Sequence, residues 1–135
     1  MQSAIVAGFI LVTASCGERA GTAVAALPAA VPIPTPAAPG SGEPNLSTAP
    51  DGSVLLSWVE AADGGQALRF AVLGDSGWNE PRTIARGTDW FVNWADFPSL
   101  IQLHDGTLAA HWLQRSGDGT YAYGVRIARS QDGGA

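Results

Sequence analysis

The sequence predicts an all-β fold built from a repeated unit, as in a β-propeller. One stretch, residues 44–58, recurs at residues 98–112. The 135 residues also hold 17 Gly, 9 Pro and 5 Trp but few charges, which favours turns and strands over helices. Asp-Gly turns divide the chain into short segments of strand length. A repeat period near 50 residues is typical of propellers and other repeat arrays.

Five identities in a common register carry the repeat. Pro44, Leu46, Asp51, Gly52 and Trp58 recur as Pro98, Leu100, Asp105, Gly106 and Trp112. A hydroxyl residue, Ser53 or Thr107, follows each of these two Asp-Gly pairs. Each copy is therefore expected to be a hairpin, with a short strand, an Asp-Gly turn and a second strand that ends in Trp. Because these residues recur, we interpret them as scaffold, with both Asp residues in turns.

Residues 1–16 are expected to be an export signal. An uncharged apolar run at residues 4–14 has the length of a signal-peptide core and is short for a membrane span. Small residues then lead to Cys16, which resembles the lipobox of bacterial lipoproteins. That resemblance implies lipidation of Cys16, a membrane anchor, and a periplasmic or cell-surface location. The alternatives are a plain secretory signal with an incidental Cys and a cytosolic core segment.

Residues 17–43 are expected to be a linker rich in Pro and Ala. Five of the nine prolines lie between residues 28 and 39, which favours extended polyproline II geometry and prevents a helix or a central strand. A stiff, solvated spacer suits a domain that stands off a membrane. The alternative is a Pro-rich ligand for a recognition module.

Residues 44–84 predict a first blade of four antiparallel strands. Turns are expected at Asp51-Gly52, at Asp63-Gly64-Gly65 and at residues 74–77, where Gly permits positive φ. The expected strands are residues 46–49, 53–60, 67–73 and 78–84.

Residues 85–97 connect the two copies and hold most of the candidate site residues. Asp96 is a candidate acid/base or ligand contact, although such an Asp also caps turns. Trp90 and Trp94 are candidates for a sugar-stacking platform, with packing between blades as the alternative. His111, in the next copy, is a third candidate for substrate contact, or else a packed, hydrogen-bonded His.

Residues 98–135 predict an incomplete second blade. Its expected strands are residues 100–103, 107–114 and 120–129. The segment Ser130-x-Asp132-x-Gly134 then resembles the start of the Asp-box, a turn motif between the third and fourth strands of sialidase blades. In that motif Asp and Ser bond the turn backbone, and Gly allows the bend.

Residues 44–135 therefore resemble the first part of a bacterial sialidase-like propeller with Asp-box (BNR) repeats. The resemblance implies about two blades of a six-bladed ring and an exported exo-acting glycoside hydrolase for sialylated or related glycans. Such enzymes use an Arg cluster, a Tyr nucleophile with a Glu partner, and an Asp acid/base. The Phe-Arg-Ile-Pro motif of the family's first blade is absent, so no catalytic residue carries over. We expect an N-terminal fragment that is inactive alone. The alternative is a non-catalytic surface propeller lipoprotein that binds glycan or protein.

Charge and spacing argue against other function classes. The net charge is -5 and no basic stripe is present, which argues against nucleic acid as a partner. No spacing of His, Cys, Asp or Glu is typical of a metal site, and no phosphate-binding loop is present. No metal and no cofactor is therefore expected.

Overall fold

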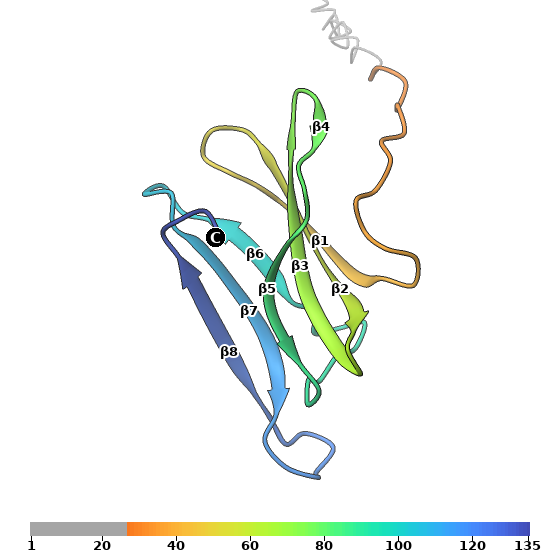
Figure 1. Ribbon diagram of the computed structural model, residues 1–135, viewed down its shortest axis with the longest axis vertical. Coiled ribbons are helices and arrows are strands. Elements are labelled where there is room, and N and C mark those ends of the chain that lie inside the picture. The colour runs from red at the N-terminus through yellow and green to blue at the C-terminus, as the bar shows by residue number, and fades with distance from the viewer. Residues whose placement is uncertain (1–26) are drawn as a thin grey trace, which may run out of the picture. The chain divides into compact units, whose positions relative to one another are not determined.

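The computed structural model describes residues 27–135 (Figure 1). Residues 32–135 form one compact unit, and all strands of the described part lie in it. They are β1 (Gly42–Thr48), β2 (Val54–Ala62), β3 (Gly65–Gly74), β4 (Gly77–Trp78), β5 (Arg82–Gly87), β6 (Ser99–Gln102), β7 (Leu108–Arg115) and β8 (Tyr123–Ser130). The expected signal segment and Cys16 lie outside the described residues.

The prediction of an all-β fold is confirmed for residues 27–135, where every regular element is a strand. The strands form two antiparallel sheets. Sheet 1 has the order β1-β2-β3-β4, with β5 also paired to β3, and sheet 2 has the order β6-β7-β8. Each strand follows its neighbour through a short turn, so both sheets grow by successive hairpins.

The two sheets repeat the same strand pairing. In sheet 1, Asn45 pairs with Ser57, and 54 residues later Ser99 pairs with His111 in sheet 2. The third strands also correspond, because Arg69 pairs with Trp58 as Arg126 pairs with Trp112. The spacing of these two arginines is 57 residues, since the segment from the paired Trp to the Arg is three residues longer in the second copy. Each residue of sheet 2 therefore has a defined counterpart in sheet 1.

The repeated Asp-Gly turns have the same geometry. The Asp51 carboxylate accepts the Ser53 N–H at 2.9 Å, and the Asp105 carboxylate accepts the Thr107 N–H at 3.0 Å. The Gly after each Asp has positive φ, 87° and 84°, which side-chain-bearing residues rarely adopt. The sequence interpretation of both Asp residues as turn residues agrees with these contacts.

The fourth strand of the first copy differs from its expected course over residues 78–84. It is split into β4 and β5, because Pro81 has no N–H to continue the ladder. The Asn79 side chain covers the gap, since its Oδ1 accepts the Val72 N–H at 2.9 Å. Pairing resumes at Arg82 and continues to Gly87, so sheet 1 extends beyond the expected end of the first blade at residue 84.

Side chains alternate between two faces of each sheet. We call the face of sheet 1 that carries Leu55, Ser57, Val59, Leu68 and Phe70 its front face. The counterpart positions in sheet 2 are Ala109, His111, Leu113, Val125 and Ile127. The back face carries Leu46, Leu56 and Trp58 in sheet 1, and Leu100, Ala110 and Trp112 in sheet 2.

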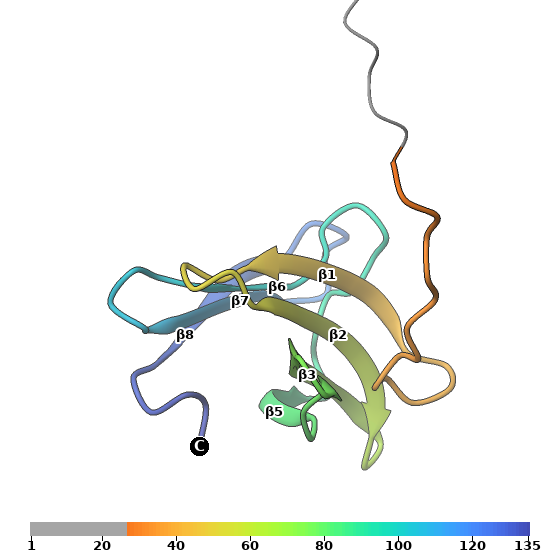
Figure 2. The same ribbon diagram turned by 90° about the horizontal axis from the view of Figure 1, so that it is seen from above.

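The core of the described unit lies between unlike faces of the two sheets. Leu55, Val59, Leu68 and Phe70 from the front face of sheet 1 form one buried cluster with Leu100, Leu108 and Ala110 from the back face of sheet 2. The first strands of the two sheets, β1 and β6, lie side by side (Figure 2), and the Ser47 hydroxyl donates to the Leu100 carbonyl at 2.7 Å. The two repeats therefore pack head to tail, front on back.

The Asp105 turn predicts a defined acid sensitivity. The Thr107 backbone N–H, followed by its side chain, holds the pKa of Asp105 below its ordinary value. A carboxyl group whose pKa is lowered by folding stabilises the protein above about pH 4, and the contribution disappears as the pH falls through the folded-state pKa. Asp105→Asn should therefore be less stable than the parent at pH 7, and the difference should shrink toward pH 2. Urea unfolding across this range measures it.

The matched control is Asp118→Asn, which removes the same charge from an exposed loop side chain without a hydrogen bond among residues 27–135. Its free energy of unfolding at pH 7 should be close to that of the parent. An equal and pH-independent loss for both variants would contradict the role given to the Asp105 turn.

Candidate functional site

The connection between the sheets presents Trp94 and Asp96 on a turn organised by Asn93. The Asn93 Oδ1 accepts the N–H groups of Ala95 and Asp96 at 2.7 and 3.0 Å. Its Nδ2 donates to the Asp96 carboxylate at 3.1 Å. Trp94, between them, is 88% exposed. The Asn side chain thus orders a surface turn that carries one bare aromatic ring and one oriented carboxylate.

Trp90 lies elsewhere, inside the core. It is 7% exposed, and its ring lies 5.7 Å from the ring of Trp112. The backbone beside it bonds the end of β7, where the Phe91 N–H donates to the Leu113 carbonyl at 3.0 Å. Trp90 therefore packs between the sheets, the alternative considered from the sequence, and the two Trp of the connection do not share a surface.

His111 and Asp96 line one surface depression of about 400 Å³. The His111 Nδ1 and the Ser99 hydroxyl lie 3.0 Å apart on paired strand positions. The remaining lining residues are Asn45, Ala95, Phe97, Ser99, Leu113 and Val125. The floor of this depression is the front face of sheet 2. The counterpart of His111 in sheet 1 is Ser57, which is 1% exposed beneath the other sheet. His111 thus occupies a position that is covered in the first repeat.

The Asp-box-like segment forms a tight turn after β8. The Ser130 hydroxyl donates to the Asp132 carboxylate and lowers the pKa of Asp132, and the Gly134 N–H donates to both side chains. A Cβ on Gly134 would come within 2.9 Å of the Phe70 ring. The turn therefore closes on itself and packs against sheet 1, a structural role for all three motif residues.

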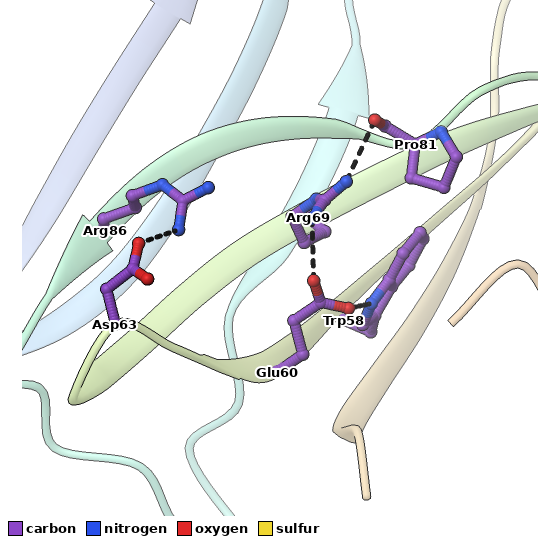
Figure 3. Close-up of polar contacts among 6 residues, drawn as sticks. All are labelled: Trp58, Glu60, Asp63, Arg69, Pro81 and Arg86. Carbon is purple, nitrogen blue, oxygen red and sulfur yellow. Dashed lines mark hydrogen bonds and ion pairs between the residues drawn. The ribbon is translucent and has the colours of Figure 1, made fainter. Parts of the chain in front are cut away.

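A polar cluster on the back face of sheet 1 was missed in the sequence interpretation (Figure 3). The Glu60 carboxylate accepts the Trp58 Nε1–H at 2.9 Å and pairs with Arg69 at 2.7 Å. Arg69 also donates to the Pro81 carbonyl at 3.1 Å. The signal in the sequence was the repeat, because Trp58, Glu60 and Arg69 align with Trp112, Gln114 and Arg126.

The second repeat replaces the acidic residue and rearranges these contacts. Arg126 donates to the Gln114 Oε1 at 2.7 Å, and the Gln114 Nε2 donates to Asp89 in the connection at 2.7 Å. The buried Trp112 Nε1 then has no acceptor within residues 27–135. Both recurrent arginines are thus engaged by scaffold groups.

Comparisons with known proteins do not place the chain in a family. No protein-family model matches the sequence, and no curated protein matches it. Over residues 27–135, no helix is long and apolar enough to cross a membrane, and no three His, Cys, Asp or Glu side chains gather as metal ligands would. The functional argument therefore depends on the geometry of the described residues and on the sequence patterns.

The Glu60 cluster predicts unequal effects for two arginine substitutions. Arg69→Ala leaves the largely buried Glu60 carboxylate without its cation, so it should lower the free energy of unfolding by about 3 kcal/mol. Arg86→Ala removes a longer, exposed pair with Asp63 (Figure 3) and should cost less than about 1 kcal/mol. Chemical unfolding of both variants measures the difference, and equal losses would contradict it.

Proposed function

We propose that this chain is part of an exported, sialidase-like β-propeller that contacts glycans through the turn at residues 93–97. The support for the propeller is the head-to-tail packing of two equivalent antiparallel sheets. Propellers arrange four-stranded blades radially, so each blade meets the next with unlike faces. The packing of the front face of sheet 1 against the back face of sheet 2 supports such an arrangement. The Asp-box-like turn after β8 is a second, independent support.

The observation that carries the glycan proposal is the exposed ring of Trp94 beside an oriented carboxylate. A Trp at 88% exposure is unusual, because such a ring usually buries its large apolar area. Sugar rings present apolar C–H faces that stack on aromatic rings and hydroxyl groups that donate to carboxylates. Trp94 supplies the first contact, and Asp96, held by Asn93, supplies the second.

Residues 27–135 are proposed to bind without hydrolysing. An exo-sialidase needs several arginines aimed at the substrate carboxylate and a Tyr nucleophile. Arg69 and Arg126 are bonded to Glu60 and Gln114, and Tyr123 stacks on Phe91 with ring centroids 4.2 Å apart. These engagements favour a second candidate, a non-catalytic propeller lipoprotein that binds glycan at a cell surface.

Trp94→Ala should weaken glycan binding selectively. Loss of one aromatic stacking contact is worth about 1 kcal/mol, so the affinity for sialyllactose should fall by about three- to tenfold. Calorimetric titration of the full chain with sialyllactose and with lactose measures this change and shows whether the sialic acid matters. Tyr121→Ala is the matched control, because Tyr121 is 83% exposed in a different loop.

Two results would contradict the proposal. Equal affinities for the parent and Trp94→Ala would remove the turn from the binding site. Turnover of a fluorogenic sialoside by the chain, for which we expect none, would show that the residues present suffice for hydrolysis.

The chain is further proposed to be anchored to a membrane through a lipid on Cys16. The support is the apolar run at residues 4–14 followed by small residues and Cys16. Expressed in a bacterium fed an alkyne-labelled fatty acid, the parent should take up the label, and Cys16→Ser should not. Equal labelling of the two would exclude this anchor. Ser15→Ala, a neighbouring change that keeps a small residue, serves as the control.

A further inference from the structure

The front face of sheet 2 is an exposed apolar surface. Three of its large aliphatic side chains, Ile101, Val125 and Ile127, are 47%, 60% and 71% exposed, whereas Leu113 on the same face is buried. Ile101 lies on β6, and Val125 and Ile127 lie on β8, so they flank the central strand β7 on one side of the sheet. A patch of this kind on a folded protein is typical of an interaction surface.

The first repeat shows what covers such a face. Leu68 and Phe70 are the counterparts of Val125 and Ile127, and they are 0% and 2% exposed. They are buried by the back face of sheet 2, which contributes Leu100, Leu108 and Ala110 to the same cluster. The partner that fits a front face is therefore the back face of an equivalent sheet.

The chain itself also exposes the matching surface. Leu46 on the back face of sheet 1 is 65% exposed, whereas its counterpart Leu100 is 3% exposed in the core. On the same back face Trp58, Ala67 and Ala71 are buried, so its open part lies around Leu46. Each molecule thus carries an open front-face patch on sheet 2 and an open back-face patch on sheet 1 whose counterparts bind each other inside the same chain. We propose that the front face of sheet 2 binds the back face of sheet 1 of a second copy of this chain.

The segment before β1 lies over part of that back face without filling it. Residues 35–44 and the side chains of Leu56 and Trp58 line a hollow of about 380 Å³. The hydrogen bonds of this segment before β1 are local, such as Ser41 N–H to the Ala38 carbonyl at 3.2 Å. It is joined to β2 by no hydrogen bond before the strand pairing at Gly42. The segment can therefore shift when a second copy docks, at the cost of few polar contacts.

The contact proposed is heterologous, because the two copies use different surfaces. A heterologous contact leaves one free face at each end of a pair, so copies add until a ring closes or a chain grows. A symmetric dimer would instead bury the same face of both copies. Mixing two variants, each damaged on a different face, therefore distinguishes a heterologous contact from a symmetric dimer, which loss of association in a single variant would not do.

The experiment uses two full-length variants that each damage one face. Ile127→Asp places a charge on the front face of sheet 2, and Leu46→Asp places one on the back face of sheet 1. Both positions are largely exposed, so the fold should survive, which circular dichroism and thermal unfolding check. Light scattering after size exclusion measures the mass of each variant alone and of the two mixed. Residues 1–41 are identical in all samples, so differences report the two faces.

The parent chain should form assemblies larger than a dimer at high concentration. Each variant alone should run as a monomer, and the equimolar mixture should form a one-to-one complex, since Ile127→Asp keeps its back face and Leu46→Asp keeps its front face. Tyr121→Asp, the control at an exposed loop position, should assemble like the parent. A monomeric parent, a mixture that stays monomeric, or assembly of Leu46→Asp alone would overturn the proposal. None of these outcomes bears on glycan binding at Trp94.

Discussion

The contact between the front face of sheet 1 and the back face of sheet 2 determines most of the described structure. It buries Leu68, Phe70 and Leu100 to 3% exposure or less, and neither sheet has another apolar layer of comparable size among the described residues. Apolar burial is the main favourable term in folding, so the two sheets stabilise each other. The connection must then pass from β5 to β6 along the edge of this contact, and Trp90 fills the space there.

The exposed turn at residues 93–97 depends on that buried anchor. Trp90 and the Phe91 bond to β7 hold the start of the connection, and the paired strand β6 holds its end. Between these two fixed ends, Asn93 replaces missing backbone partners with its side chain. A short turn held at both ends keeps Trp94 at the surface at a lower entropy cost than a free loop, which is favourable for ligand binding.

Head-to-tail packing of two repeats leaves the outer face of each sheet without a partner sheet. Two sheets that pack through unlike faces bury one front face and one back face against each other, and within residues 27–135 the other front face and back face have no partner sheet. His111 illustrates the consequence, because its position is a buried Ser57 in the first repeat and the floor of an open depression in the second. The depression at His111 therefore lies on the face that an equivalent sheet covers in the first repeat. The turn at Trp94 differs in this respect, since it lies in the connection and outside the repeated faces.

The sequence alone determined the strand-rich fold, the repeat register and the Asp-Gly turns, because these depend on neighbours a few residues apart. Asp105 and Gly106 define their turn through one local hydrogen bond and one positive φ. Only the tertiary structure separated Trp90 from Trp94, one buried and one exposed, although both lie in one aromatic-rich segment. It also revealed Glu60 as a partner of Arg69 across paired strands. Burial and cross-strand contacts depend on which sheet faces which, and spacing along one chain does not contain that information.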